Sequence, residues 1–297
     1  MVDRKNAAPP PEPGQRVSDL LRPPAGPVDL AAVDTRETPG FTGSGKADAQ
    51  AATDQLREEL SDLQERLYAE GRAGGRRSLL LVLQGMDTSG KGGVVKHVLG
   101  LVNPMGVRYH SFGRPTVEEL EHHFLWRVKA RLPAPGIIGV FDRSHYEDVL
   151  VVRVHALVPE EMWSARYGVI NRFEAELASG TRIVKCFLHI SAEEQRKRLL
   201  ARLGDPTKHW KYEPGDVTER QHWADYQQAY EDALDRCNTE AAPWYVIPAD
   251  RKWYRDWAIS HLLAEQLRAM ALTWPASTDW DVEAERARLD AASPEGD

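Results

Sequence analysis

The chain has 297 residues, a hydrophobic fraction of 42% and a net charge of −7, which suits one large domain or two small ones with a sizeable core. It contains no apolar run near the roughly 20 residues of a membrane span and no secretory signal pattern, and its two cysteines are typical of a cytoplasmic protein. We therefore expect neither a membrane nor nucleic acid as a partner. An anion site is not excluded, because basic residues outnumber acidic ones between residues 69 and 212.

The first 75 residues are expected to lie outside the main domain. Residues 1–28 are rich in proline, alanine, glycine and charge, and this composition predicts a disordered tail because little apolar surface is available to offset ordering. Residues 29–75 are expected to form an extended arm and then an amphipathic helix. Four leucines recur along that helix at helical spacing: Leu56, Leu60, Leu63 and Leu67.

Residues 76–275 are predicted to form one α/β domain, because apolar strand-like runs alternate with helical patterns. The five predicted strands are Leu79–Gln84, Val107–Phe112, Ile137–Phe141, Ile183–Ile190 and Trp244–Ile247. Such alternation implies a parallel sheet that is covered by helices on both faces. Residues 276–297 follow as an acidic C-terminal tail.

Two patterns of Ser or Thr followed three residues later by Glu mark the starts of predicted helices. Thr116 and Glu119 form a capping box that opens a single helix over residues 117–132, and Ser191 and Glu194 open the helix after the fourth strand. The apolar residues of the first helix make one stripe: Val117, Leu120, Phe124, Val128 and Leu132. This stripe is typical of a helix that covers a sheet.

The phosphate-loop pattern G-x-x-x-x-G-K occurs twice, over residues 40–46 and 85–91. Only the second copy follows a predicted strand and precedes a helical pattern, the arrangement that joins loop amides and a helix N-terminus in a phosphate site. We therefore assign phosphate binding to the second copy and interpret the first as a plain loop. The usual pattern continues with Ser or Thr, whose hydroxyl binds magnesium, but here Gly92 follows Lys91.

Two acidic residues are candidates to replace that hydroxyl as ligands of Mg²⁺, with Mn²⁺ as an alternative ion. Asp87 lies inside the loop, and Asp142 follows the third predicted strand, which would bring it to the carboxyl edge of the sheet. Magnesium prefers oxygen ligands and keeps several waters, so two carboxylates suffice. The alternatives are that Asp87 stabilises the loop and that Asp142 caps the next helix.

Seven segments together carry a resemblance to a known family: GMDTSGKGG, FGRPT, FLWR, FDRSHYEDVLVVRVH, FLHIS, KHWKYEPGD and WYVIPADRKWYRDWA. Over about residues 38–272 the chain resembles the polyphosphate kinase 2 family. The resemblance implies a three-layer α/β P-loop fold similar to thymidylate kinase, with a five-stranded parallel sheet, helices on both faces and a helical lid at about residues 204–217. It also implies magnesium-dependent, reversible transfer of the terminal phosphate between inorganic polyphosphate and nucleotides, and assembly as a homodimer or homotetramer.

The acceptor is expected to be a nucleoside mono- or diphosphate, and both AMP and ADP are candidates. The segment SHYEDVLVVRVH resembles the branch of the family that accepts both. Members of that branch often read Lys-Ala-Pro-Thr where this chain has Gly-Arg-Pro-Thr at residues 113–116, and they often carry an acid in place of Gly92.

The resemblance also assigns roles to individual residues. Asp87 and Lys91 belong to the Walker A loop and Asp142 and Arg143 to Walker B, and these four are the expected catalytic residues. The expected phosphate- and nucleotide-binding residues are Gly85, Met86, Thr88, Ser89, Gly90, Gly92 and Gly93 in the loop, Arg114 after the second strand, and Lys208 and Lys211 in the lid. Arg198 and Arg202, on the helix before the lid, are expected to join them because of their positive charge and not because of the resemblance.

Donor and acceptor are both anionic in such a transfer, so alignment and charge neutralisation matter more than a strong general base. Two other functions stay open. An ATP-dependent nucleoside monophosphate kinase shares the fold and the lid, but it ordinarily keeps the loop hydroxyl, so Gly92 counts against it. A non-catalytic nucleotide sensor or a GTPase-like switch is disfavoured by the two metal-binding acids and by the lack of a guanine-reading N-K-x-D motif.

Overall fold

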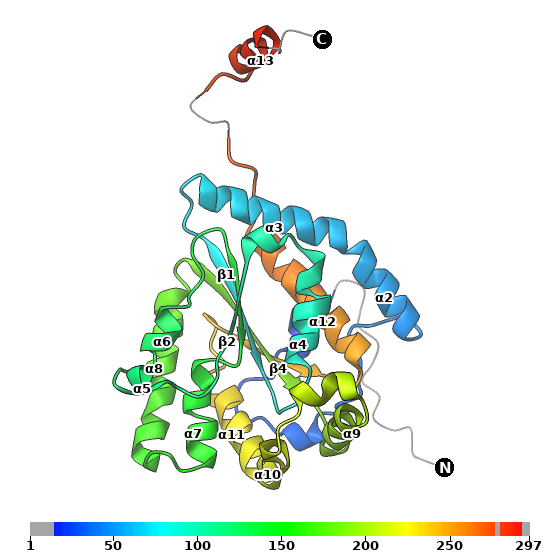
Figure 1. Ribbon diagram of the computed structural model, residues 1–297, viewed down its shortest axis with the longest axis vertical. Coiled ribbons are helices and arrows are strands. Elements are labelled where there is room, and N and C mark those ends of the chain that lie inside the picture. Colours follow the sequence, from blue (N-terminus) through cyan, green and yellow to red (C-terminus); the bar gives the residue numbers. More distant parts are fainter. Residues whose placement is uncertain (1–14, 277–279, 293–297) are drawn as a thin grey trace.

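The computed structural model describes residues 15–276 and 280–292, and it contains the predicted parallel sheet (Figure 1). The five strands are β1 Ser78–Gln84, β2 Val107–Ser111, β3 Ile138–Asp142, β4 Thr181–His189 and β5 Trp244–Pro248. Every pairing is parallel, and the strand order is β2-β3-β1-β4-β5. All five strands that the sequence predicts are confirmed, with ends that shift by at most two residues.

Helices cover both faces of the sheet and make the three predicted layers (Figure 1). The α-helices of the described residues are α1 Val17–Leu21, α2 Lys46–Gln55, α3 Arg57–Arg72, α4 Lys91–His97, α5 Val117–Leu120, α6 Trp126–Lys129, α7 Val151–Val154, α8 Glu160–Leu177, α9 Ala192–Leu203, α10 Gly215–Gln221, α11 Trp223–Arg236, α12 Lys252–Ala269 and α13 Val282–Ala291. Short 3-10 turns η4 His145–Asp148 and η5 Pro206–Lys211 connect several of them.

Strand β1 shows why two apolar layers form. Successive side chains of a strand point to opposite faces. Leu81 and Leu83 therefore join the cluster that contains α4 and α12, whereas Leu80 and Val82 join the cluster that contains α6 and α8. All seven residues of β1 are buried, as expected for a strand at the centre of a covered parallel sheet.

The predicted amphipathic helix is present as two helices, α2 and α3, which meet at Leu56. The four leucines of its apolar stripe are all buried: Leu56, Leu60, Leu63 and Leu67. Both helices pack against α12, which itself contacts β4 and β5. The leucine stripe of α2 and α3 thus packs mainly against α12, which lies between these helices and strands β4 and β5.

The single helix predicted over residues 117–132 is wrong. The capping box of Thr116 and Glu119 is present, but it opens only the four residues of α5, and a second short helix, α6, starts at Trp126. Between them His123 accepts a hydrogen bond from the Leu125 amide through Nδ1, at 3.3 Å. The first turn also has little to pack against, since Val117 is 78% exposed. Periodicity predicted the apolar stripe but not that its first half lies in solvent.

The predicted disordered tail is partly wrong, because residues 15–28 are placed against the domain. Val17 and Leu21 of α1 are buried, and the amides of Val17 and Ser18 donate to the Glu265 carboxylate on α12 at 2.7 and 2.9 Å. This carboxylate satisfies amides at the N-terminus of α1 that the helix itself leaves without partners. Residues 1–14 of the predicted tail lie outside the described residues.

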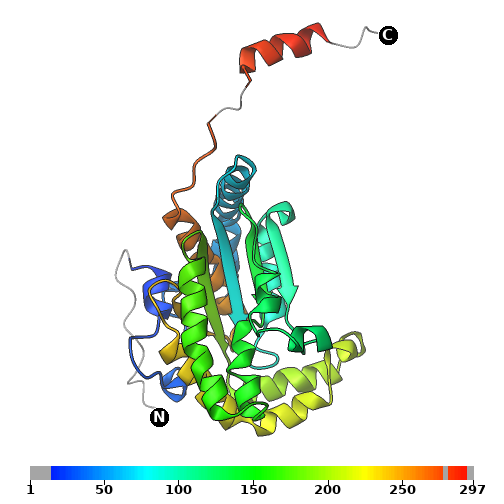
Figure 2. The same ribbon diagram turned by 90° about the vertical axis from the view of Figure 1, so that its left-hand side faces the viewer.

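The predicted acidic tail includes α13, which stands apart from the domain in both views (Figures 1 and 2). Residues 277–279 and 293–297 of that tail lie outside the described residues. Within residues 15–276 and 280–292, none of the helices has the combined length and apolarity that crossing a bilayer requires.

Candidate active site

The loop over residues 85–90 joins β1 to α4 and has the backbone of a phosphate-binding turn. Gly85, Thr88 and Gly90 have φ angles of 148°, 65° and 112°. A Cβ at Gly85 would lie 2.7 Å from the Leu188 carbonyl oxygen, and a Cβ at Gly90 would lie 1.8 Å from the Arg255 guanidinium. At positions 85 and 90, only glycine can adopt such a backbone angle with neighbours this close. The other copy of the pattern, residues 40–46, precedes α2 and lies at no strand end, as predicted.

The loop region contains two buried hydroxyls and a buried lysine. Thr88 Oγ1 and Ser89 Oγ are buried and have no hydrogen-bond partner. Buried polar atoms without partners are rare in folded proteins and commonly mark a ligand site. Lys91 is also buried, and its Nζ donates to the Gly85 carbonyl oxygen at 2.8 Å. Burial and then the nearby Arg143 lower the pKa of Lys91, although the carboxylates of three acidic residues oppose the shift.

Asp142 and Arg143 lie next to this loop because β3 is the neighbour of β1. Leu83 pairs with Asp142 in the register of the two strands, and the Arg143 amide donates to the Leu83 carbonyl at 3.0 Å. The Arg143 guanidinium reaches Asp87 Oδ1 at 2.8 Å. Burial would raise the pKa of Asp87, but Lys91 and Arg143 outweigh it and hold that pKa below its ordinary value.

Asp142 does not cap the helix that follows, which was the alternative to its metal role. The N-cap of η4 is Ser144, whose side chain accepts from the Tyr146 amide at 3.2 Å. The Asp142 carboxylate instead accepts from Tyr109 Oη at 3.2 Å, at the carboxyl edge of the sheet. This position leaves it available for a ligand of the loop.

The residues present fit a divalent cation that prefers oxygen ligands. Asp87 lies in the loop and is bonded to Arg143, and Asp142 precedes Arg143 at the end of β3, so both carboxylates lie at the same edge of the sheet. In the part of the chain that the structure describes, no group of three or more His, Cys, Asp or Glu side chains is placed to hold a metal ion. A cation here would therefore have two protein carboxylates and take its other ligands from substrate phosphates and water, as magnesium does in many phosphate sites.

Glu147 belongs to the site, although the sequence analysis did not single it out. It lies on η4, and its Oε1 accepts from Gln84 Nε2 at 3.1 Å. Burial raises its pKa, while Arg143, Gln84 and Lys91 act in the opposite direction. The only signal in the sequence was its place five residues after Asp142. This spacing places Glu147 in the site only because the tight turn of η4 returns its side chain to Gln84 at the end of β1.

Arg255 is a second residue that the sequence analysis missed. It is buried on α12 and donates to Asp256 from Nε and Nη2. Its guanidinium occupies the space beside Gly90 and Gly93, where added Cβ atoms would meet it at 1.8 and 2.5 Å. By contrast, a Cβ at Gly92 would meet no atom within 4 Å. Gly90 and Gly93 are therefore needed for packing, whereas Gly92 is not.

Arg198 was expected to bind phosphate, but the structure uses all of its donors inside the protein. Nη1 donates to the carbonyls of Thr88 and Ser89 at 2.9 and 3.0 Å. Nη2 donates to the carbonyls of Ala249 and Asp250, and Nε donates to Glu194. These bonds hold the backbone of the phosphate loop from behind, so we propose that Arg198 supports the loop and does not contact substrate.

Replacing Arg198 by alanine is accordingly expected to lower the free energy of unfolding by about 3 kcal/mol, because it removes the donor to four carbonyls and to the partly buried Glu194 carboxylate. Urea unfolding followed by circular dichroism measures this change. Lys197→Ala is a matched control, since Lys197 is its exposed neighbour on α9. Unchanged stability together with weaker polyphosphate binding would instead assign Arg198 to the substrate.

The predicted lid consists of η5 and the start of α10, and only part of it faces the loop. Arg202 donates to the Lys211 carbonyl at 2.9 Å and lies 3.6 Å from Asp216. After the larger effects of burial, Lys91 and Arg143, its charge also lowers the pKa of Asp87. Lys208 pairs with Asp205 at 2.7 Å, and Lys211 lies over the exposed ring of Trp210.

Arg114 is exposed and lies two residues after Phe112, whose amide donates to the Asp142 carbonyl at 2.9 Å. The structure thus brings Arg114 to the same edge of the sheet as the loop. Of the remaining predicted residues, Met86 lies in the loop between β1 and α4, and Gly92 and Gly93 lie in the first turn of α4.

Comparisons with known proteins agree with this arrangement. The sequence profile of the family described as polyphosphate kinase 2 matches residues 43–274. A relative from Meiothermus ruber, named AMP/ADP-polyphosphate phosphotransferase, is 49% identical over 253 residues, which cover 85% of this chain and 93% of the relative. An ADP-polyphosphate phosphotransferase of Rhodopseudomonas palustris is 46% identical over 74% of this chain and 80% of its own length. The crystal structure of a polyphosphate kinase 2 from Arthrobacter aurescens superposes with a TM-score of 0.90 at 48% identity, covering 96% of this chain and 100% of that one.

Proposed function

The chain belongs to the polyphosphate kinase 2 family, and from this premise we propose that it transfers the terminal phosphate between inorganic polyphosphate and AMP or ADP. The single observation that carries the proposal is the loop itself, in which the buried Lys91 lies with the unpartnered, buried hydroxyls of Thr88 and Ser89. The products would be ADP or ATP in one direction and a longer polyphosphate in the other.

The proposed site works by alignment and charge. The loop amides, the hydroxyls of Thr88 and Ser89 and the Lys91 ammonium bind the oxygens of the transferred phosphate. Arg143, which is held by Asp87, presents a guanidinium to the same oxygens. A nucleotide phosphate is already ionised near neutral pH, so the attacking oxygen needs no strong base.

We propose magnesium as the cation, with manganese able to replace it, because carboxylate and phosphate oxygens are hard ligands. When bound, the cation supplies positive charge that reduces repulsion between the donor and acceptor phosphates. Asp87 and Asp142 would hold it. In this proposal the hydroxyls of Thr88 and Ser89 bind phosphate oxygens and are not ligands of the cation.

The nucleotide acceptor would bind near Glu147 and Arg114, at the edge of the sheet where both residues lie. One of the relatives cited above is named for both AMP and ADP and the other for ADP alone. We propose that this chain accepts both. Assembly as a homodimer or homotetramer and a cytoplasmic location stay predictions, which light scattering of the purified protein and cell fractionation would test.

The test of the function is donor dependence. The purified full chain is incubated with magnesium, polyphosphate and either AMP or ADP, without any nucleoside triphosphate, and the nucleotides are separated by chromatography. We expect ADP and ATP to form. AMP phosphorylation that requires ATP would indicate the nucleoside monophosphate kinase instead, and binding of nucleotide without turnover by any donor would indicate a sensor.

Replacing Asp87 by alanine is expected to raise the magnesium concentration for half-maximal rate by at least about threefold, since one oxygen ligand is lost while the loop amides and Lys91 remain. The measurement is a magnesium titration at saturating polyphosphate and nucleotide. Excess magnesium should recover part of the rate.

Gly92→Ser offers the site the usual hydroxyl, and the open space at Gly92 should admit it. In the Asp87→Ala background it is expected to move the magnesium midpoint back toward that of the unmodified chain. If Asp87→Ala lowers the maximal rate without moving the midpoint, Asp87 shapes the loop by holding Arg143 and is not a ligand.

A further inference from the structure

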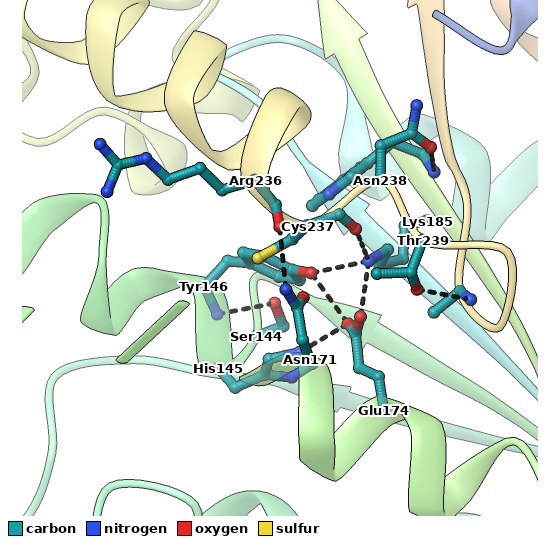
Figure 3. Close-up of polar contacts among 12 residues, drawn as sticks. Ser144, His145, Tyr146, Asn171, Glu174, Lys185, Arg236, Cys237, Asn238 and Thr239 are labelled. Atoms are coloured by element: carbon teal, nitrogen blue, oxygen red, sulfur yellow. Dashed lines mark hydrogen bonds and ion pairs between the residues drawn. The ribbon is translucent and has the colours of Figure 1, made fainter. Parts of the chain in front are cut away.

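A buried network of charged and polar side chains includes His145 and Tyr146, which follow Arg143 by two and three residues (Figure 3). Lys185 of β4 and Glu174 of α8 are both fully buried, with 2.6 Å between Nζ and Oε2. Lys185 Nζ also donates to Tyr146 Oη at 2.7 Å and to the Cys237 carbonyl at 2.8 Å. All three donors of this ammonium group are therefore used.

The second oxygen of Glu174 binds the same segment. Glu174 Oε1 accepts from Tyr146 Oη at 2.9 Å and lies 3.0 Å from His145 Nε2. Burial would raise the pKa of Glu174, but Lys185 and His145 outweigh it and keep that pKa below its ordinary value, so the carboxylate is ionised. Tyr146 Oη is thus held between a buried cation and a buried anion, and Figure 3 shows its ring beside both.

Such a pair is an expensive way to stabilise a core. Two ions lose their hydration on burial, and a well-packed apolar pair of similar volume often gives equal or greater stability. The benefit must then lie in the fixed direction of the hydrogen bonds, which apolar side chains do not provide.

The part of the chain that the network holds is the start of η4, directly after Arg143. Arg143 has a φ of 63°, a region that non-glycine residues seldom adopt and that persists only where neighbouring contacts enforce it. On one side its amide is bonded to Leu83. On the other side the chain is fixed three positions later, by Tyr146.

We propose that Tyr146 is a positioning residue for phosphoryl transfer, and that its hydroxyl, held by Lys185 and Glu174, sets the backbone from which Arg143 reaches the phosphate loop. The inference rests on the proposed function, because it concerns the same site. Small displacements of a group that aligns the reactants reduce turnover with little change in substrate affinity.

The test is Tyr146→Phe, which removes the hydroxyl but keeps the ring that packs against Trp244, at 4.7 Å between centroids, and the Lys185–Glu174 pair. We expect kcat to fall about 10-fold while KM for polyphosphate and for nucleotide changes less than about twofold. Tyr245→Phe is the matched control. Tyr245 is equally buried on β5, and its hydroxyl contacts only Gln266 among the hydrogen bonds of the described residues, so kcat should not change.

A double variant separates positioning from general destabilisation. If Tyr146 acts through Arg143, adding Tyr146→Phe to Arg143→Ala should lower kcat by less than about twofold further, because contacting residues that act as a unit are not additive. Should Tyr146→Phe fail to fold, the joint exchange Lys185→Met with Glu174→Leu removes both partners of the hydroxyl without leaving a lone charge, and the same loss of kcat is expected.

Two outcomes overturn the positioning role while leaving the function intact. One is a kcat of Tyr146→Phe equal to that of Tyr245→Phe, and the other is full multiplication of the losses in the double variant. An unmodified chain that does not use polyphosphate at all would overturn the proposed function, and this inference with it.

Discussion

Lys91→Ala is expected to reduce turnover with polyphosphate by at least about 100-fold while the fold survives. The physical reason is the position of the ammonium group. It is buried and bonded to the Gly85 carbonyl of the loop, where a positive charge acts on phosphate oxygens with little screening by water. The measurement is the rate of ADP or ATP formation at saturating substrates, with circular dichroism and thermal unfolding to check the fold.

Two further variants sharpen this result. Lys91→Met keeps the length and apolar volume of the side chain without its charge, so a similar loss would attribute the effect to charge and not to a cavity. Lys46→Ala is the matched control, because Lys46 is the lysine of the other copy of the loop pattern and is exposed at the start of α2. It should leave turnover unchanged, and a comparable collapse there would mean that phosphate binds at residues 40–46.

Asp142→Asn is expected to reduce turnover by at least about 100-fold as well, since it replaces a carboxylate by an amide of the same shape at the place where charge must be neutralised. The exchange still permits an oxygen to accept from Tyr109. The register of β3 with β1 does not depend on the charge. Stability should therefore change little, and thermal unfolding checks this.

The control for Asp142→Asn is Asp62→Asn. Asp62 lies on α3, where it pairs with Arg66 at 2.7 Å on the surface. Its substitution should leave turnover unaffected. A well-folded Asp142→Asn protein with near-normal turnover would remove Asp142 from the mechanism and leave Asp87 and Glu147 as the acids of the site.

The losses of turnover expected for the Lys91 and Asp142 variants test two different interactions of the site, one with phosphate and one with the cation. Lys91 acts on the phosphate oxygens directly, whereas Asp142 acts through a divalent cation. The Asp142 variant should therefore need more magnesium for half-maximal rate, whereas the Lys91 variant should keep the magnesium midpoint of the unmodified chain. Titrating magnesium in both variants distinguishes a loss of cation binding from a loss of phosphate binding.

Much of the architecture was predictable from the sequence, and the physical reason is local. The five strands follow from short apolar runs between helical patterns, and parallel pairing follows from that alternation. The loop at residues 85–91 was separable from its copy at residues 40–46 because only the former has a strand before it. The place of Asp142 at the carboxyl edge follows from its position after an apolar run. Its identity as one of a family's acids came from resemblance and not from spacing.

Features that depend on contacts between distant segments were not predictable in this way. The break between α5 and α6 arises because the first half of the stripe finds no partner, and α1 forms because Glu265, far along the chain, accepts from its amides. Arg198 was assigned to phosphate from its charge, yet its donors all reach carbonyls and a carboxylate of the protein. Charge is visible in a sequence, but the direction of a guanidinium is not.

By itself the sequence determined the order of the strands along the chain, the position of the loop that we propose to bind phosphate and the lack of the usual hydroxyl at Gly92. These features follow from backbone preference and side-chain periodicity, which are properties of neighbouring residues. The tertiary structure decided which side chains face that loop. It brought Glu147 back to Gln84, placed Arg255 against the loop glycines and enclosed Lys185 and Glu174 behind Tyr146. These are contacts between residues that lie from a few tens to more than a hundred positions apart, and their formation depends on how the layers pack around one core.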